Sequence, residues 1–157
     1  MLDVKDCIWV EVDNPLTKPL IVPTFWVPNV ILSSDFLISV SPLKVIRDMG
    51  SLSIMNMLTL LPSSKYSTGE LTGWETLYSQ GIERVITDLY FTLPFDLGIV
   101  EGTQKFSSRD ESVYGDAEDY GKIFVGEPYQ VDLEVTEELG IRTEYLELIE
   151  EAREEME

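Results

Sequence analysis

The sequence contains no histidine and a single cysteine, Cys7, among its 157 residues. Without histidine, the chain cannot form a Ser-His-Asp type of triad or a His-ligated zinc or iron site, and it lacks the usual general base near neutral pH. One cysteine cannot form an internal disulfide bond, which favours a reducing compartment. Because the segment MLDVKD also lacks the basic and apolar regions of a signal peptide, we expect a cytoplasmic protein.

Long apolar runs are missing as well. The most apolar window, residues 20–32, is interrupted by Pro23, Pro28 and Asn29. It is shorter than the roughly 20 apolar residues that a membrane-spanning helix needs. We therefore expect no membrane span.

Basic residues are scarce. The chain contains 11 lysines and arginines and 29 aspartates and glutamates, and its net charge is −18. Residues 101–157 alone contain 18 acidic and 5 basic residues, a net charge of −13. A surface of this sign repels phosphate backbones and anionic lipids, so nucleic acid and membranes are not expected as partners. Two interpretations stay open, namely a solvated acidic surface and a surface for a basic partner.

What the sequence does contain indicates an α/β fold in one domain spanning residues 1–157, with residues 35–140 at its centre. Residues 35–41 form a nearly continuous apolar run that ends at Pro42, which is typical of a buried parallel strand. An amphipathic helix over residues 74–93 begins with the capping box of Thr72 and Glu75 and leads directly into an apolar strand over residues 97–100. This helix–strand succession predicts a mostly parallel sheet with flanking helices, a Rossmann-like three-layer arrangement.

The remaining segments complete this prediction. Residues 7–12 and 122–125 read as strands, residues 49–61 as a buried helix, and the segment from Pro128 to Gly140 as another helix. Residues 143–157 form an acidic C-terminal helix. Residues 102–121 are polar and predict a long mobile loop that covers a ligand. Asp88 lies beside the apolar stripe of the 74–93 helix and is expected to be solvated or salt-bridged.

The sequence offers little support for a nucleotide-binding or metal-binding motif. No GxGxxG or P-loop segment follows a strand, which excludes nucleotide binding by those two devices. Asp116, Glu118, Gly121 and Glu127 have the spacing of EF-hand positions. However, Tyr120 occupies a ligand position of that loop, so we expect no metal site.

Candidate site residues follow from the predicted parallel sheet, in which ligands bind beyond the carboxyl ends of the strands. Lys44 and Arg47 follow the first predicted strand, and Glu101, Gly102 and Thr103 end the second. The buried-helix prediction gives Asn56 an amide that needs hydrogen-bond partners. Together these groups could hold a small anionic ligand or cofactor. The alternative is a Glu–Lys pair on a solvated edge.

Four segments, DFLISVSPLK, SLSIMNMLTLLP, ERVITDLYFTLPFDLGIVEG and KIFVGEPYQVDLEVTEELG, resemble domain-of-unknown-function family 362 over residues 35–140. The resemblance implies a fold akin to the N-terminal domain of nickel-dependent lactate racemases. Many members of that family are joined to ferredoxin-type segments, which implies an iron–sulfur or other redox protein as a partner. The positions that match the family pattern, and that the resemblance therefore marks as site residues, are Lys44, Asn56, Glu101, Gly102 and Asp132.

The chain departs from that family at the same positions. Val45 and Ile46 follow Lys44 where the family has Thr-His, Met55 precedes Asn56 where the family has lysine, and Glu101 replaces an aspartate. The cysteines that would bind a cluster are absent. A shortened member that has lost the family's chemistry would show this pattern.

Three functional hypotheses result. The leading one is the binding of an anionic small molecule or cofactor at the carboxyl ends of the parallel strands. The second is a non-catalytic acidic protein-interaction module. The third is metal-dependent hydrolysis or group transfer through Glu101 and Asp132. No particular cofactor is indicated.

Overall fold

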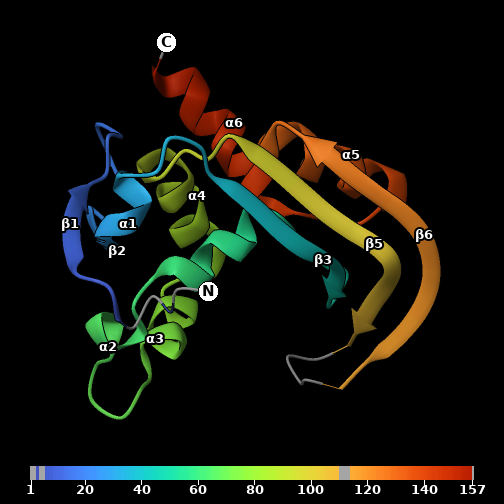
Figure 1. The fold of residues 1–157 in the computed structure, drawn as a ribbon, viewed down its shortest axis with the longest axis horizontal. Helices are drawn as coiled ribbons and strands as arrows, with labels where there is room; N and C mark the ends of the chain where they lie inside the picture. Colours follow the sequence, from blue (N-terminus) through green and yellow to red (C-terminus); the bar gives the residue numbers. More distant parts are fainter. Residues whose placement is uncertain (1–2, 4–5, 110–113, 157) are drawn as a thin grey trace. The chain divides into compact units, whose positions relative to one another are not determined.

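The computed structural model describes residues 3, 6–109 and 114–156 (Figure 1). The chain forms two compact units, the first made of residues 1–35, 57–94 and 148–157 and the second of residues 36–56 and 95–147. Each unit combines segments that are distant in the sequence, so no single cut in the chain separates them. Within the described part of the chain, no helix is long and apolar enough to cross a membrane.

The second unit is built on a four-stranded sheet of order β4-β3-β5-β6. Its strands are β3 (Ile38–Ile46), β4 (Met49–Ser51), β5 (Leu97–Ser108) and β6 (Asp116–Gly126). Among these strands only β3 and β5 pair in parallel, whereas β3–β4 and β5–β6 are antiparallel. The sheet is therefore mixed and the protein is a small α+β protein, so the prediction of a mostly parallel, Rossmann-like sheet was wrong. The sequence revealed the two apolar strands that do pair in parallel but not the hairpins attached to them.

The β5–β6 hairpin lies where we predicted a long loop. Strand β5 continues to Ser108 and β6 begins at Asp116, so the loop prediction for residues 102–121 was wrong for most of the segment. Residues 110–113 lie outside the described residues. The strands here are held by polar pairs across the ladder, in which Gln104 lies opposite Asp119 and Lys105 forms an ion pair with Glu118. Such pairs support a sheet without the apolar alternation that marks a strand in a sequence.

A tight turn replaces the start of the helix predicted over residues 49–61. Ile46 pairs with Met49 across a two-residue loop, and both loop residues, Arg47 (φ 52°) and Asp48 (φ 62°), are left-handed. This is the geometry of a two-residue hairpin turn whose twist matches that of the strands. The chain then forms a 3₁₀ helix, η2 (Met55–Leu60), so the prediction of a long α-helix was wrong.

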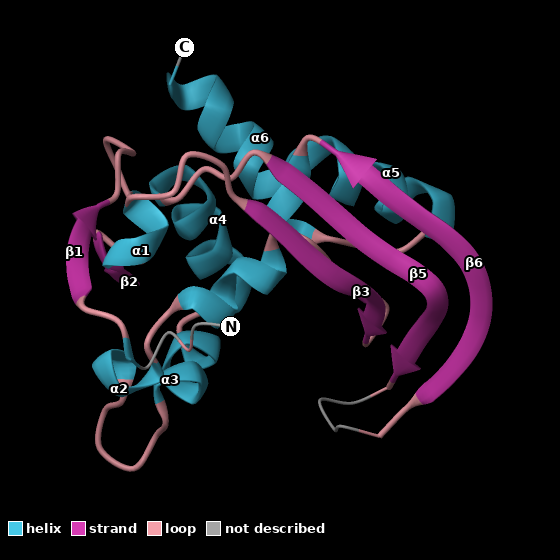
Figure 2. Cartoon of the chain, viewed as in Figure 1, coloured by secondary structure: helices cyan, strands magenta, loops and turns pink. Residues whose placement is uncertain are grey.

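One face of the sheet is covered by α5 (Pro128–Leu139), which lies behind β5 and β6 in the view of Figure 2. The predicted helix boundaries are confirmed, with Pro128 in the first turn and Gly140 (φ 60°) as the C-cap. Helix α6 (Glu144–Met156) follows and confirms the predicted acidic C-terminal helix. Helix α5 approaches the sheet closely at Gly98, where an added Cβ would lie 3.2 Å from the Pro128 Cα. The core under α5 consists of Leu43, Leu52, Val100, Phe124, Val131 and Val135.

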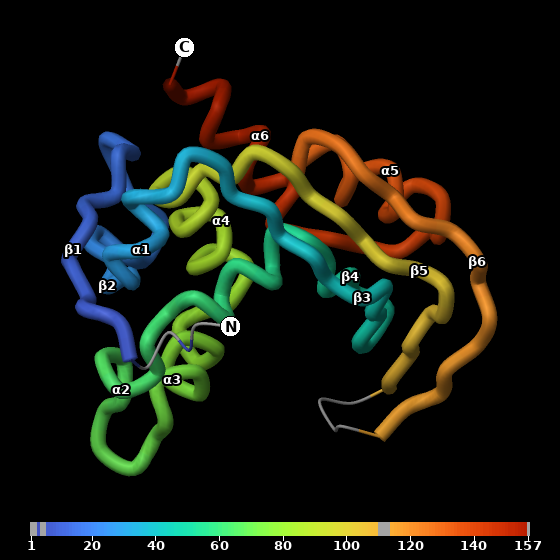
Figure 3. Tube along the Cα trace, in the orientation of Figure 1, coloured from blue at the N-terminus to red at the C-terminus, as the bar shows by residue number. Residues whose placement is uncertain are grey.

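The first unit contains a two-stranded antiparallel sheet of β1 (Trp9–Asp13) and β2 (Thr24–Pro28). Its helices are α1 (Asn29–Leu32), α2 (Ser63–Tyr66), α3 (Gly73–Ser79), α4 (Ile82–Thr92) and the C-terminal part of α6 from residue 148, traced in Figure 3. The capping box of Thr72 and Glu75 is confirmed. The single helix predicted over residues 74–93 is divided into α3 and α4, because Gly81 adopts φ 96° between them. As a result Tyr78 is 49% exposed, although it belongs to the predicted core stripe.

Candidate functional site

The predicted site residues of the second unit lie on two different faces of its sheet. Along β3 the side chains of Ser39, Ser41, Leu43 and Val45 are buried, and those between them are more exposed. We call the face under α5 the covered face and the opposite one the open face. Lys44 follows the alternation of the open face, and Glu101 joins it because it lies opposite Pro42 in the ladder.

Asn56 belongs to the covered face. Its amide Nδ2 donates to the Ser39 Oγ at 3.1 Å and to the Val40 carbonyl at 3.2 Å. The hydrogen-bond partners that the sequence required are thus supplied by β3. Gly102 also faces this side, where an added Cβ would lie 3.1 Å from the Leu43 side chain of the core. The sheet therefore separates Asn56 from Lys44 and Glu101.

On the open face, Lys44 and Glu101 each have a local partner. The Lys44 ammonium lies 5.6 Å from the centre of the Phe106 ring, a cation–π distance. Glu101 accepts hydrogen bonds from the Thr103 hydroxyl and, at 2.8 Å, from the Thr103 backbone N–H. These hydrogen bonds lower the pKa of Glu101. Arg47 lies in the β3–β4 turn. The anionic-ligand role of these residues stays a prediction.

Asp132 is fully buried in α5 and supports backbone rather than facing a cavity. Its carboxylate accepts hydrogen bonds from Ser53 N (3.0 Å), Ser53 Oγ (2.7 Å), Ile54 N (2.9 Å) and Tyr145 Oη (2.8 Å). Burial raises the pKa of this carboxyl group to about 6, against the opposing effect of these hydrogen bonds. Its contacts join α5, the segment before η2 and the first residues of α6.

Asp88 has the same role in the first unit, and the prediction that it is solvated or salt-bridged was wrong. It is fully buried and accepts four hydrogen bonds, from Asn14 Nδ2 (2.8 Å) and from the backbone N–H groups of Leu20 (2.9 Å), Ile21 (2.7 Å) and Val22 (2.7 Å). The signal for its burial was present, because Asp88 lies one turn after Val85 and one turn before Thr92 on a single helix face.

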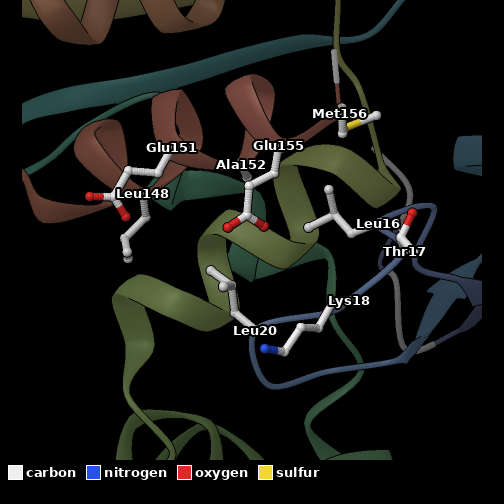
Figure 4. A pocket seen from close by; sticks show the side chains of 9 residues that line it. All are labelled: Leu16, Thr17, Lys18, Leu20, Leu148, Glu151, Ala152, Glu155 and Met156. Carbon is white, nitrogen blue, oxygen red and sulfur yellow. The ribbon is translucent and has the colours of Figure 1, made fainter.

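The loop that Asp88 holds forms one wall of a cavity of about 390 Å³ in the first unit (Figure 4). Helix α6 forms the other wall, and the Glu155 carboxylate points into the space between them. Leu20 and Met156, at 37% and 57% exposure, leave the mouth open to solvent. None of the predicted site residues lines it. The lining residues are Leu16, Thr17, Lys18, Leu20, Leu148, Glu151, Ala152, Glu155 and Met156.

The most unusual surface is an aliphatic patch on the open face of the sheet. In the ladder, Val40 pairs with Ile99 and Ile99 with Val125, so three aliphatic side chains form one row across three strands. Four of the patch residues, Ile38, Val40, Ile123 and Val125, are between 53% and 61% exposed. We call the following set the open-face patch: Ile38, Val40, Pro42, Leu97, Ile99, Ile123 and Val125.

Sequence reasoning missed this patch because it assigned the same apolar residues to a sheet covered on both faces. A contiguous exposed patch of aliphatic side chains is a common mark of a protein-binding surface. By contrast, no group of three acidic or cysteine side chains in the described ranges could hold a metal ion.

Comparisons of the chain with protein-family models, curated proteins and solved structures gave no match. The resemblance to family 362, with the redox partner that it implies, therefore stays a prediction.

Proposed function

We propose that the protein is a non-catalytic interaction module that binds a basic protein through the open-face patch. One observation carries the proposal, which is that the sheet face opposite α5 presents seven aliphatic side chains to solvent. A sheet with one covered face ordinarily places polar side chains on the other. Here the solvent side is apolar around the row of Val40, Ile99 and Val125.

The free energy available from covering the patch is substantial. Full burial of a valine or isoleucine side chain is worth about 1.5 to 3 kcal/mol relative to full exposure. Four residues that are more than half exposed, with three more beside them, can therefore contribute several kcal/mol to association. Association costs on the order of 4 to 15 kcal/mol in lost freedom, so further polar contacts around the patch are needed for stable binding.

The negative charge of the chain favours a partner of positive charge. The first unit contains 14 acidic and 5 basic residues and the second 15 and 6, so each has a net charge of −9. Any partner that approaches the open face meets a negative potential, which repels a second copy of this chain and attracts a basic protein. On the open face itself, Glu101 lies between Pro42 and Ile123 of the patch, and Asp119 and Lys44 lie farther along β6 and β3.

The anionic-ligand hypothesis has less support from the geometry. It needs Lys44, Asn56 and Glu101 at one site, and the sheet lies between Asn56 and the other two. The Asp132 carboxylate, which the third hypothesis requires, already accepts four hydrogen bonds in the core. The interaction-module hypothesis, by contrast, requires only the open-face patch, which is exposed.

A capture experiment with matched variants tests the proposal. The wild-type chain, Val40→Asp and Leu32→Asp are immobilised and exposed to an extract of the cells that produce the protein. Leu32, 52% exposed in the first unit, allows the same replacement of an exposed aliphatic side chain by an aspartate away from the patch. The captured protein is then purified, and its binding to each variant is measured by calorimetry.

We expect a basic protein that binds the wild type and Leu32→Asp alike and loses its affinity for Val40→Asp. Purified components must reproduce this difference. Equal binding to Val40→Asp by every captured protein would refute a role for the open-face patch.

A further inference from the structure

We infer that the partner covers the open-face patch with an amphipathic helix whose apolar stripe is followed by lysine or arginine. This inference rests on the proposed function and specifies the element that the partner contributes. It is drawn from the dimensions of the patch, from its polar border and from the way in which the covered face is packed.

The patch has the footprint of a short helix. Along β3 it extends from Ile38 to Pro42, four residue steps or about 13 Å. Across β3, β5 and β6 it spans two strand spacings, about 10 Å. A helix is about 10 Å in diameter with its side chains, and a stripe at i, i+4 and i+8 is about 12 Å long.

The rest of the open face argues against a second sheet as the occupant. In the last row of the patch, Glu101 lies between Pro42 and Ile123, and beyond that row the same face carries Lys44, Phe106, Gln104 and Asp119. Sheets that pack face to face need apolar side chains along most of both inner faces. An aliphatic area that ends after five residues of β3 is too short for that arrangement and sufficient for a helix.

The covered face shows how such a helix packs on this sheet. Helix α5 places Val131, Val135 and Leu139, which have the spacing i, i+4 and i+8, on the core that contains Val100. Next to Leu139, Glu138 forms an ion pair with Lys122 of β6 at 2.6 Å.

On the open face, the acidic residues Glu101 and Asp119 belong to the sheet. The sheet also carries Lys44 there, whose ammonium lies over the Phe106 ring, so a further basic residue that complements both carboxylates must come from the helix. The hydrogen bonds from Thr103 lower the pKa of Glu101 and hold its carboxylate in the row between Pro42 and Ile123.

Synthetic peptides test the inference. The probe is an amidated peptide of about 18 residues with leucines on one helical stripe and lysines elsewhere. A second peptide has the same composition in an order that distributes the leucines around the helix. Binding of both is measured by fluorescence anisotropy in about 150 mM salt, with the wild type, Val40→Asp, Glu101→Gln and Leu32→Asp.

We expect the striped peptide to bind the wild type about tenfold more tightly than the scrambled one. Val40→Asp adds a negative charge, yet it should weaken binding of the striped peptide about tenfold, because it places that charge in an apolar contact. Glu101→Gln should weaken binding about threefold and reduce its salt dependence. Leu32→Asp should bind like the wild type.

Equal or tighter binding of the striped peptide to Val40→Asp would overturn the inference, because the peptide would then follow net charge alone. Equal binding of the two peptides would overturn it as well. If Val40→Asp does not fold, Val125→Thr, which keeps strand propensity, replaces it with an expected loss of about threefold.

The outcomes separate this inference from the proposed function. A purified partner that depends on Val40, together with peptides that do not, would refute the helix and leave the binding module in place. If neither depends on Val40, both proposals fail. A wild-type dimer in sedimentation velocity that Val40→Asp dissociates would replace the basic partner by a second copy of the chain.

Discussion

Two buried aspartates, Asp88 and Asp132, show how this acidic chain uses carboxylates inside its core. Each lies on a helix and accepts four hydrogen bonds within its own unit. The donors to Asp88 lie in residues 14–22, and those to Asp132 lie in residues 53–54 and in Tyr145 of α6. A buried carboxylate is tolerated only where such donors compensate for the loss of water. Both carboxylates therefore accept hydrogen bonds from backbone N–H groups of irregular segments. These segments are the loop before β2 and the segment before η2.

Removal of the Asp88 carboxylate should destabilise the first unit strongly. Asp88→Ala leaves three backbone N–H groups and one N–H of the Asn14 amide without their acceptor. We expect a loss of about 3 to 5 kcal/mol in the free energy of unfolding, measured by urea denaturation. Asp13→Ala, at an exposed position on β1, is the control and should cost less than about 1 kcal/mol. Equal losses for the two variants would contradict the role of Asp88.

Asp132 should make stability depend on pH in a defined direction. Its folded-state pKa of about 6 lies above the ordinary value of 3.8, so folding takes up a proton between these values. The stabilising contribution of Asp132 is therefore complete below the lower pKa and is lost as pH rises through the higher one.

Asp132→Asn, which does not titrate, isolates this effect from the other carboxylates. Between pH 7.5 and pH 4, the wild type should gain about 2 to 3 kcal/mol of unfolding free energy relative to the variant. Urea denaturation at several pH values gives both curves. Parallel curves, or a relative loss for the wild type at low pH, would show that the hydrogen bonds outweigh burial.

At the level of elements, the sequence predicted those that are apolar or clearly capped. Helix α5 was found from Pro128 and Gly140, and the parallel partners β3 and β5 from their apolar runs. The polar half of the β5–β6 hairpin was missed, because its strands are held by charged and amide pairs across the ladder. The candidate site was predicted from an assumed parallel sheet, and the alternation of the real strands places its residues on opposite faces.

The division between α3 and α4 depends on Gly81. Its φ of 96° is readily accessible only to glycine, and an added Cβ would meet no atom within 4 Å. Gly81→Ala should therefore lower the unfolding free energy by about 1 to 2 kcal/mol through backbone strain alone. Ser79→Ala, two residues earlier at the end of α3, serves as the control in the same thermal or urea denaturation. A neutral effect of Gly81→Ala would mean that the two helices can join.

For the molecule as a whole, the excess of negative charge is the dominant property. The sequence suggested an acidic C-terminal third, but each folded unit has the same net charge of −9, because each unit combines distant segments. The acidic character therefore belongs to both units rather than to one tail. Self-repulsion of this kind opposes folding and is reduced by salt.

Thermal stability should consequently rise with ionic strength at neutral pH. We expect the Tm to increase by a few degrees between about 20 and 200 mM sodium chloride, because screening weakens the repulsion. The control is the same titration near the isoelectric point of about 4.1, where the Tm should respond little. A Tm that falls with salt at neutral pH would indicate that ion pairs dominate over repulsion.

The central claim, that the open-face patch binds a basic protein, is tested most directly by methyl NMR of the chain with the purified partner. We expect shifts for the methyl groups of Ile38, Val40, Ile99, Ile123 and Val125, and unchanged signals for Val131 and Val135 on the covered face. Val40→Asp should remove these shifts. Shifts that spare the open face and fall on the first unit would contradict the claim.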